Sequence, residues 1–189
     1  MAPKDFFTTY APFAIDTQIK YGVPASITLA QAALESGWGE SGLTKKANNF
    51  FGIKADPSWS GPVINMATGE VFNGVGTTIN SNFRKYASPG DSFNDHAKFL
   101  TDNKRYSNLF AVSMNDPYYY VKWAQGLKSD GYATALSYDT SLINEIAIYG
   151  LTKYDKEAIS KKKMTLIAGV SLVIIVIIGT LYLLFKKDK

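Results

Sequence analysis

Apolar residues recur at helical spacing near the N-terminus and predict two consecutive helices. Residues 5–21 place several aromatic side chains on roughly one face, and Gly22 supplies the stop. Residues 24–36 open with a proline, are rich in alanine and leucine, and end before Gly37. Both stretches are therefore expected to pack one apolar face into a common core.

The pattern changes over residues 55–86, where Gly, Pro, Asn and Thr are frequent and apolar residues alternate loosely. This composition predicts a small antiparallel β-hairpin or a three-stranded lobe, with turns near Thr68-Gly69 and Asn73-Gly74. Since strands and helices do not alternate, the predicted class is α+β and mainly helical, with the β lobe forming one wall of a cleft. Helical spacing returns in three later segments, at residues 91–102, 117–129 and 140–149.

The last apolar run is longer than the others. Residues 164–185 contain no charged side chain, and as a helix they would measure roughly 33 Å, enough to cross a bilayer core. The sequence therefore predicts a domain over residues 1–152, a polar basic linker at 153–163, a transmembrane helix at 164–185 and a basic tail at 186–189. The N-terminus has no apolar run of signal-peptide length.

The net charge of +4 is unevenly distributed along the chain. Residues 161–189 hold six lysines and one aspartate, so the preceding part carries a net charge of −1. A near-neutral domain lacks the basic surface of a nucleic-acid binder, and we expect no nucleic-acid partner. The chain has no cysteine and one histidine, His96, which excludes cysteine nucleophiles and zinc sites with several histidine ligands.

Glu35 is the first candidate for chemistry. It falls in the last turn of the alanine-rich helix, where the negative end of the helix dipole disfavours a carboxylate charge. Partial burial against Trp38 would raise its pKa further, as a general acid near neutral pH requires. A solvated surface glutamate is the alternative that the residue pattern leaves open. His96 lies on an apolar helix face and is expected to be structural, and the nearby aspartates lack calcium-loop spacing, so no metal is expected.

Several ordered motifs carry a resemblance to a known family. Their order and spacing resemble glycoside hydrolase family 73, the bacterial and phage peptidoglycan N-acetylglucosaminidases. The resemblance covers about residues 4–150. The motifs are AQAALESGWG at 30–39, NNFFGIK at 48–54, FRKY at 83–86, SFNDH at 92–96 with Phe99-Leu100, and GYAT at 131–134.

The resemblance implies a lysozyme-like fold with Glu35 as the catalytic acid. Glu70, in the β lobe, matches the family's second carboxylate by position, and Tyr132 matches a tyrosine near the acid. Two carboxylates fit glycoside hydrolysis, one protonating the leaving oxygen and the other activating water or attacking the anomeric carbon. Since the substrates carry 2-acetamido groups, a substrate-assisted route is a third possibility, and the sequence leaves all three open.

Sugar rings stack on aromatic faces, so some aromatic side chains are expected to line the groove, with core packing as the alternative for most of them. An asparagine side chain offers hydrogen bonds to glycan or caps a turn. No cofactor is expected. The candidate substrate-binding residues are Trp38, Asn49, Phe51, Tyr119 and Trp123.

The sequence thus predicts a peptidoglycan hydrolase that cuts the β-1,4 bond between N-acetylglucosamine and N-acetylmuramic acid. A muramidase, a lytic transglycosylase and a non-catalytic peptidoglycan-binding membrane tether are the alternatives. The expected partners are glycan strands and, through residues 164–185, a lipid bilayer. An anchor without a signal peptide favours a single-pass protein in a phage virion membrane, used to breach the wall at entry. A bacterial inner membrane is the other predicted location.

Overall fold

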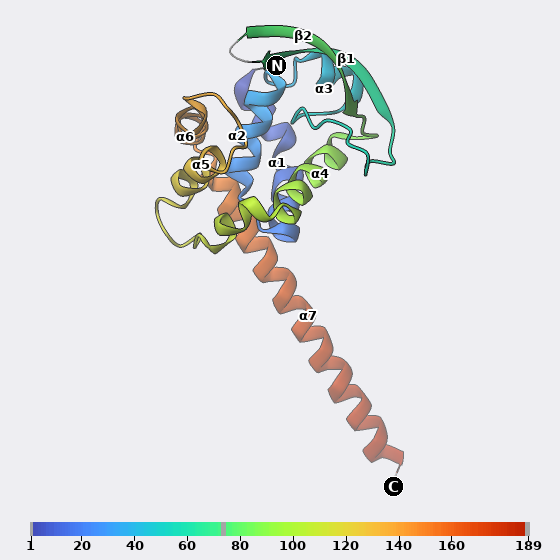
Figure 1. Cartoon of the computed structure of the whole chain (residues 1–189). Helices are drawn as coiled ribbons and strands as arrows, with labels where there is room; N and C mark the ends of the chain where they lie inside the picture. The colour runs from blue at the N-terminus through green and yellow to red at the C-terminus, as the bar shows by residue number, and fades with distance from the viewer. Residues whose placement is uncertain (1, 73–74, 188–189) are drawn as a thin grey trace.

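The computed structural model describes the backbone of residues 2–72 and 75–187, and the side chains of residues 2–69 and 78–169. Figure 1 shows a helical body, a β-hairpin at one end and a long helix that leaves the body at the other. The elements are α1 (Pro3–Tyr21), α2 (Ala25–Ser36), α3 (Gly42–Ala47), β1 (Val63–Phe72), β2 (Val75–Arg84), α4 (Pro89–Asp102), a 3-10 helix η1 (Lys104–Ala111), α5 (Tyr119–Ser129), α6 (Tyr138–Tyr149) and α7 (Thr152–Lys187).

Helix α2 is the centre of the fold. Nearly all of its side chains are buried, and it packs against α1, α5, α6 and the start of α7. Its first amides find side-chain acceptors outside the helix: Ala25 N donates to Gln18 Oε1 at 2.8 Å, and Ser26 N donates to Asp155 Oδ1 at 2.8 Å. These two bonds satisfy backbone donors that a helix start leaves unpaired. The other end of α2 stops at Gly37, whose φ of +55° suits glycine.

An aromatic cluster fixes α1 and α4 beside α2. Phe50 packs edge-on against Tyr10 at 4.7 Å and Phe93 at 5.5 Å between ring centroids. Also from α1, Phe7 meets Trp38 edge-on at 5.2 Å between ring centroids. Such edge contacts between buried rings hold neighbouring helices at a defined separation.

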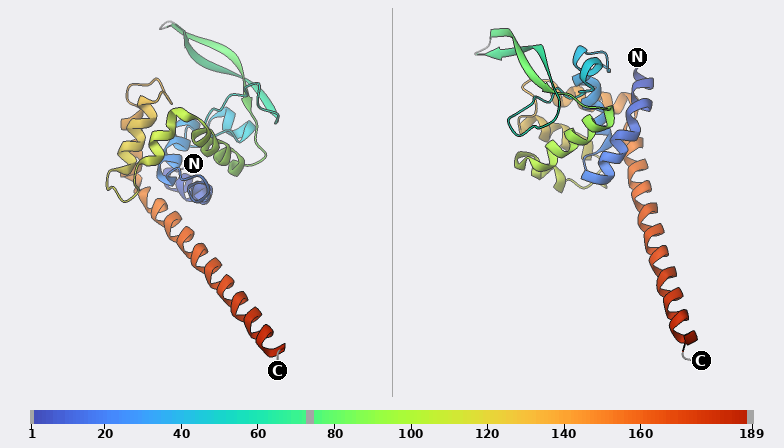
Figure 2. Two further views of the ribbon diagram at one scale, coloured as in Figure 1. Left: turned by 60° about the horizontal axis from the view of Figure 1, so that its bottom comes forward. Right: turned by 90° about the vertical axis from the view of Figure 1, so that its right-hand side faces the viewer.

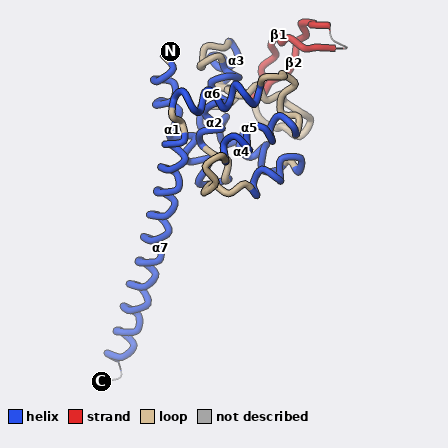
Figure 3. Tube along the Cα trace, turned by 90° about the vertical axis from the view of Figure 1, so that its left-hand side faces the viewer, coloured by secondary structure: helices blue, strands red, loops and turns tan. Residues whose placement is uncertain are grey.

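The β lobe is a single long hairpin. β1 and β2 pair antiparallel in register from Val63 opposite Arg84 to Phe72 opposite Val75. The predicted turn near Thr68-Gly69 is wrong, because both residues lie inside β1 and pair with Ile79 and Thr78. The predicted turn at Asn73-Gly74 lies outside the described residues. Figures 2 and 3 show the hairpin projecting from the helical body.

The helix predicted at residues 91–102 is α4, which begins two residues earlier. Ser88 and Asp91 form a reciprocal capping box that defines this start. A helical body with one small hairpin agrees with the predicted α+β class.

Helix α7 is one continuous helix that starts inside the body. Its first turns run through the predicted linker at 153–163 and bury Tyr154, Asp155 and Ala158 against the domain. The linker therefore has a packed face that its polar composition did not indicate. Beyond these turns α7 extends away from the body, at the end opposite the hairpin (Figures 1 and 2).

The C-terminal anchor needs correction. Among the residues that the structure describes, no helix is long and apolar enough to cross a membrane. Within that part of the chain, this finding contradicts the predicted transmembrane helix at 164–185 and the single-pass membrane localisation. It gives no support to a lipid bilayer as a partner. The described part of α7 includes a run of lysines at 161–163, whose charges do not suit a bilayer core. The side chains of 170–185 lie outside the described residues.

Candidate active site

An open pocket of about 670 Å³ forms where the end of α2 meets the base of the hairpin. Its walls come from segments far apart in the sequence. The lining residues are Glu35, Phe51, Gly52, Ile53, Lys54, Asp56, Arg84, Phe99, Tyr132, Ala133, Thr134, Ala135 and Tyr138. The pocket thus brings together Glu35, Tyr132 and Phe51, three of the site residues predicted from the sequence.

Glu35 reaches the pocket from the last turn of α2. Its side chain opens to solvent in the pocket, but the surrounding walls remove part of its hydration, and this desolvation raises the pKa of the carboxyl group. An interaction with the Tyr138 hydroxyl opposes the shift, and desolvation is the larger effect. A carboxyl group with a raised pKa that faces a pocket is suited to donate a proton near neutral pH.

The hydroxyl of Tyr138 is oriented by a second buried side chain. Gln31 Nε2 donates a hydrogen bond to this hydroxyl at 3.0 Å. Since that bond occupies an acceptor position on the oxygen, the Tyr138 proton remains available for the Glu35 carboxylate. Gln31 lies one helical turn before Glu35, so one face of α2 holds both the acid and the residue that orients its partner.

Tyr132 lines the same pocket beside Tyr138. It follows Gly131, whose φ of +76° ends the α5 region, and Tyr132 N donates to Leu127 O at 2.9 Å. The ring stacks on Tyr138 with 5.7 Å between centroids and 22° between planes. Burial raises the pKa of Tyr132 well above its usual value, with Tyr138 and Glu35 as further causes. The phenol is therefore neutral and keeps a proton to donate.

Phe51 is backed by a buried imidazole. The ring of His96 stacks on Phe51 with 3.8 Å between centroids and 9° between planes. His96 is fully buried, and burial lowers its pKa to about 3, so the imidazole is neutral at physiological pH. Among the described residues neither ring nitrogen has a hydrogen-bond partner. His96 does not itself line the pocket, but it packs against Phe51, which does.

The second predicted carboxylate lies on the hairpin. Glu70 is in β1 with Thr77 as its register partner. Its side chain lies outside the described residues, so its role stays a prediction.

The other four predicted substrate-binding residues do not line this pocket. Trp38 packs against Phe7, and Trp123 is buried in the core. Asn49 is buried, and its Nδ2 donates to the carbonyls of Ile53 and Arg84. The Tyr119 hydroxyl donates to Asp155. Their part in glycan binding stays a prediction.

Sequence reasoning did not find Gln31, Arg84 and Tyr138 as site residues. Arg84 was visible in the FRKY motif, and Gln31 stands one turn before Glu35 on the predicted helix. Tyr138 joins the site through a contact with Gln31 that spans 107 positions, and local pattern does not reveal such a contact. Across the part of the chain that the structure describes, no group of three or more potential ligands forms a metal site.

Comparison with known proteins places this geometry in context. A family model described as mannosyl-glycoprotein endo-beta-N-acetylglucosaminidase matches residues 11–151. The chain is 39% identical over 137 residues to the peptidoglycan hydrolase FlgJ of Vibrio cholerae, covering 70% of this chain and 40% of that protein. It is 36% identical over 151 residues to the exo-glucosaminidase LytG of Bacillus subtilis, covering 80% and 53%.

These curated relatives are longer, and the chain spans about half of their length or less. Among solved structures, the catalytic domain of the autolysin Auto from Listeria monocytogenes matches with a TM-score of 0.66 at 33% identity. That match covers 82% of this chain and 88% of the Listeria one.

Proposed function

Because the chain belongs to the glucosaminidase family, we propose that it hydrolyses peptidoglycan at the β-1,4 bond between N-acetylglucosamine and N-acetylmuramic acid. Membership of a glycoside hydrolase family is what the sequence motifs predicted, and the family match over residues 11–151 confirms it. The relatives named as peptidoglycan hydrolases support the same substrate for this chain.

The observation that carries the proposal is the environment of Glu35. Its carboxyl group has a raised pKa and opens into a pocket of about 670 Å³. In the proposed reaction, protonated Glu35 donates its proton to the glycosidic oxygen as the bond to the anomeric carbon breaks. The leaving sugar departs as an alcohol, and water completes the hydrolysis at the anomeric carbon.

Tyr132 and Tyr138 have different roles in this proposal. Tyr138, held by Gln31, positions the Glu35 carboxylate once the proton has left. Tyr132 lines the pocket with a neutral phenol and donates a hydrogen bond to the substrate's acetamido group or to the transition state. Glu70 is the proposed second carboxylate, and in this proposal a movement of the hairpin on substrate binding brings it to the cleft.

The test is digestion of purified peptidoglycan by the full chain, followed by borohydride reduction and mass spectrometry of the fragments. Reduced N-acetylglucosamine ends that disappear in Glu35→Gln support the proposal. Reduced muramic ends would move the cut to the other bond, and 1,6-anhydro ends would indicate a lytic transglycosylase. Retained binding with no fragments would indicate a wall-binding tether. The Glu70→Gln variant separates the mechanisms, since a substrate-assisted route tolerates its loss.

A further inference from the structure

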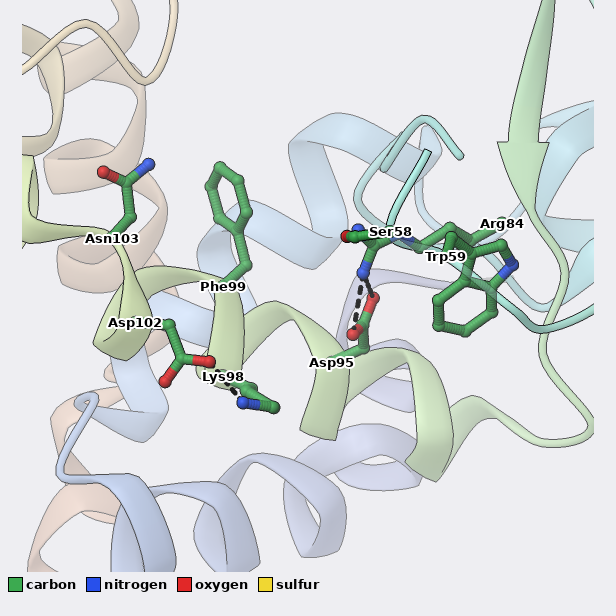
Figure 4. A pocket seen from close by; sticks show the side chains of 8 residues that line it. All are labelled: Ser58, Trp59, Arg84, Asp95, Lys98, Phe99, Asp102 and Asn103. Carbon is green, nitrogen blue, oxygen red and sulfur yellow. Dashed lines mark hydrogen bonds and ion pairs between the residues drawn. The ribbon is translucent and has the colours of Figure 1, made fainter. Parts of the chain in front are cut away.

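A second hollow adjoins the candidate active site. It measures about 450 Å³ and shares Arg84 and Phe99 with the pocket that contains Glu35. The two are therefore neighbouring parts of one groove. Figure 4 shows the second hollow, which is lined by Ser58, Trp59, Arg84, Asp95, Lys98, Phe99, Asp102 and Asn103.

Where the two hollows meet, contacts within the protein hold the lining side chains in place. Arg84 Nη1 donates to both Asp95 oxygens, at 3.0 and 2.8 Å, and the guanidinium lies over the Trp59 ring at 4.7 Å from its centroid. The Tyr86 hydroxyl donates to Asp95 at 2.6 Å. Arg84 and Asp95 are thus paired with each other. Their side chains shape the hollow, but their charges are not available to bind a ligand.

Lys98 and Asp102 are much more exposed to solvent than Arg84 and Asp95. They form an ion pair one helical turn apart on α4, and their side chains are 59% and 60% exposed. An exposed pair of this kind adds little stability, so both groups exchange partners at little cost. This side of the groove thus presents one cation and one anion, held together as an ion pair by side chains four residues apart on the helix.

The proposed substrate has a part that matches these charges. Each muramic acid of peptidoglycan carries a short peptide stem with free carboxylates and, on its diamino acid, a free amine. This stem branches from a sugar beside the bond that is cut, so it leaves the active site close to Glu35. A groove that begins at Glu35 and continues to a paired cation and anion suits such a branch.

We propose that the hollow around Lys98 and Asp102 is a subsite for the peptide stem, in which Lys98 binds a stem carboxylate and Asp102 binds the stem amine. The inference rests on the proposed function, because it takes peptidoglycan as the substrate. A further hollow of about 570 Å³ shares Trp59, Asp95 and Lys98 with this one, which extends the groove beyond the subsite in the direction of a longer or cross-linked peptide.

The experiment compares two substrates: soluble glycan strands that keep their stems, and the same strands after an amidase has removed them. The test variants of the full chain are Lys98→Ala with Asp102→Ala, and the swap Lys98→Asp with Asp102→Lys, which keeps an ion pair on the helix. The control is Glu157→Ala with Lys161→Ala, which removes an exposed pair of the same spacing on α7.

Both test variants are expected to raise KM on stem-bearing strands by about ten-fold, the loss of two charge-assisted contacts, with kcat unchanged. Neither variant is expected to change KM on stripped strands, and the α7 control is expected to match the wild type on both. Equal losses on both substrates, or unchanged KM on stem-bearing strands, would overturn the subsite.

Titration of the full chain with a free synthetic stem peptide gives a readout that needs no cleavage. Binding that is lost in the swap variant supports the subsite, and absence of binding to the wild type overturns it. A wild type that binds the peptide but cuts neither strand would overturn the proposed function while leaving the subsite supported.

Discussion

The imidazole of His96 lies flat against the ring of Phe51, with 3.8 Å between centroids and 9° between planes. Phe51 lines the candidate active site, so His96 supports one of its walls. The His96 ring is fully buried and has no hydrogen-bond partner among the described residues. A buried imidazole of this kind stays neutral, and its protonation is resisted by the whole surrounding core.

The first prediction concerns acid stability. The folded pKa of His96 is about 3, below the unfolded value of 6.5, so the unfolded state binds the proton first as pH falls. The imidazole is therefore expected to cost about 2 kcal/mol of stability between pH 7 and pH 5. Urea unfolding of the wild type and of His96→Leu at both pH values measures it. If the free energy of unfolding changes equally with pH in the two proteins, the imidazole is not buried in its neutral form.

The second prediction concerns Glu35→Gln. Loss of the general acid is expected to lower kcat by about a thousand-fold. The raised pKa of Glu35 means that the folded state binds its proton more tightly, so wild-type stability falls as pH rises through the folded pKa. The variant is thus expected to melt above the wild type at pH 7, and the gap should close below the unfolded pKa of glutamate. A melting temperature below the wild type at pH 7 would argue against desolvation at Glu35.

The third prediction concerns Tyr132→Phe. The ring keeps its stacking on Tyr138, so the melting temperature is expected to stay close to that of the wild type. Loss of the phenolic donor is expected to lower kcat about a hundred-fold, as the loss of one transition-state hydrogen bond does. Thermal unfolding and steady-state kinetics measure the two effects. Tyr106→Phe is the control, because its ring is also buried beside Tyr132 but does not line the pocket. Full activity in Tyr132→Phe would remove this tyrosine from the mechanism.

The fourth prediction concerns Asp155. Its carboxylate accepts hydrogen bonds from Ser26 N and from the Tyr119 hydroxyl. Asp155→Ala leaves both donors buried and unpaired, and is expected to cost about 3 kcal/mol of stability, whereas Asp155→Asn keeps one acceptor and is expected to cost less. Denaturant unfolding checks both, with exposed Glu157→Ala on the same helix as the control. A small effect of Asp155→Ala would show that the two hydrogen bonds to this carboxylate contribute little to stability.

The type and spacing of neighbouring residues predicted the helices whose ends are set by the local sequence. The alanine-rich run and Gly37 located the helix that carries Glu35, and helical spacing located α4 to within two residues of its start. Thr68-Gly69 misled the turn prediction, since a glycine in a long strand resembles a turn residue until its cross-strand partners are known.

Long-range contacts account for what the sequence did not predict. The segment 153–163 is polar enough to suggest a linker, but Asp155 is buried because Ser26 and Tyr119 supply donors to it. Tyr138 belongs to the site because Gln31, 107 positions earlier, orients its hydroxyl. Neither partner is visible from composition or periodicity near the residue itself.

The contact between Asp155 and Ser26 joins positions 129 residues apart, and Gln18 reaches the backbone of Asp155 across 137. A ribosome makes the chain from its N-terminus, so the helix that carries Glu35 emerges long before Asp155, the acceptor for the amide of Ser26. A nascent chain shorter than 155 residues lacks that acceptor and nearly all of α7, the helix that packs against α1 and α2 in the complete chain. The order of synthesis therefore delays the completed core, and with it a working cleft, until nearly the whole domain has been translated.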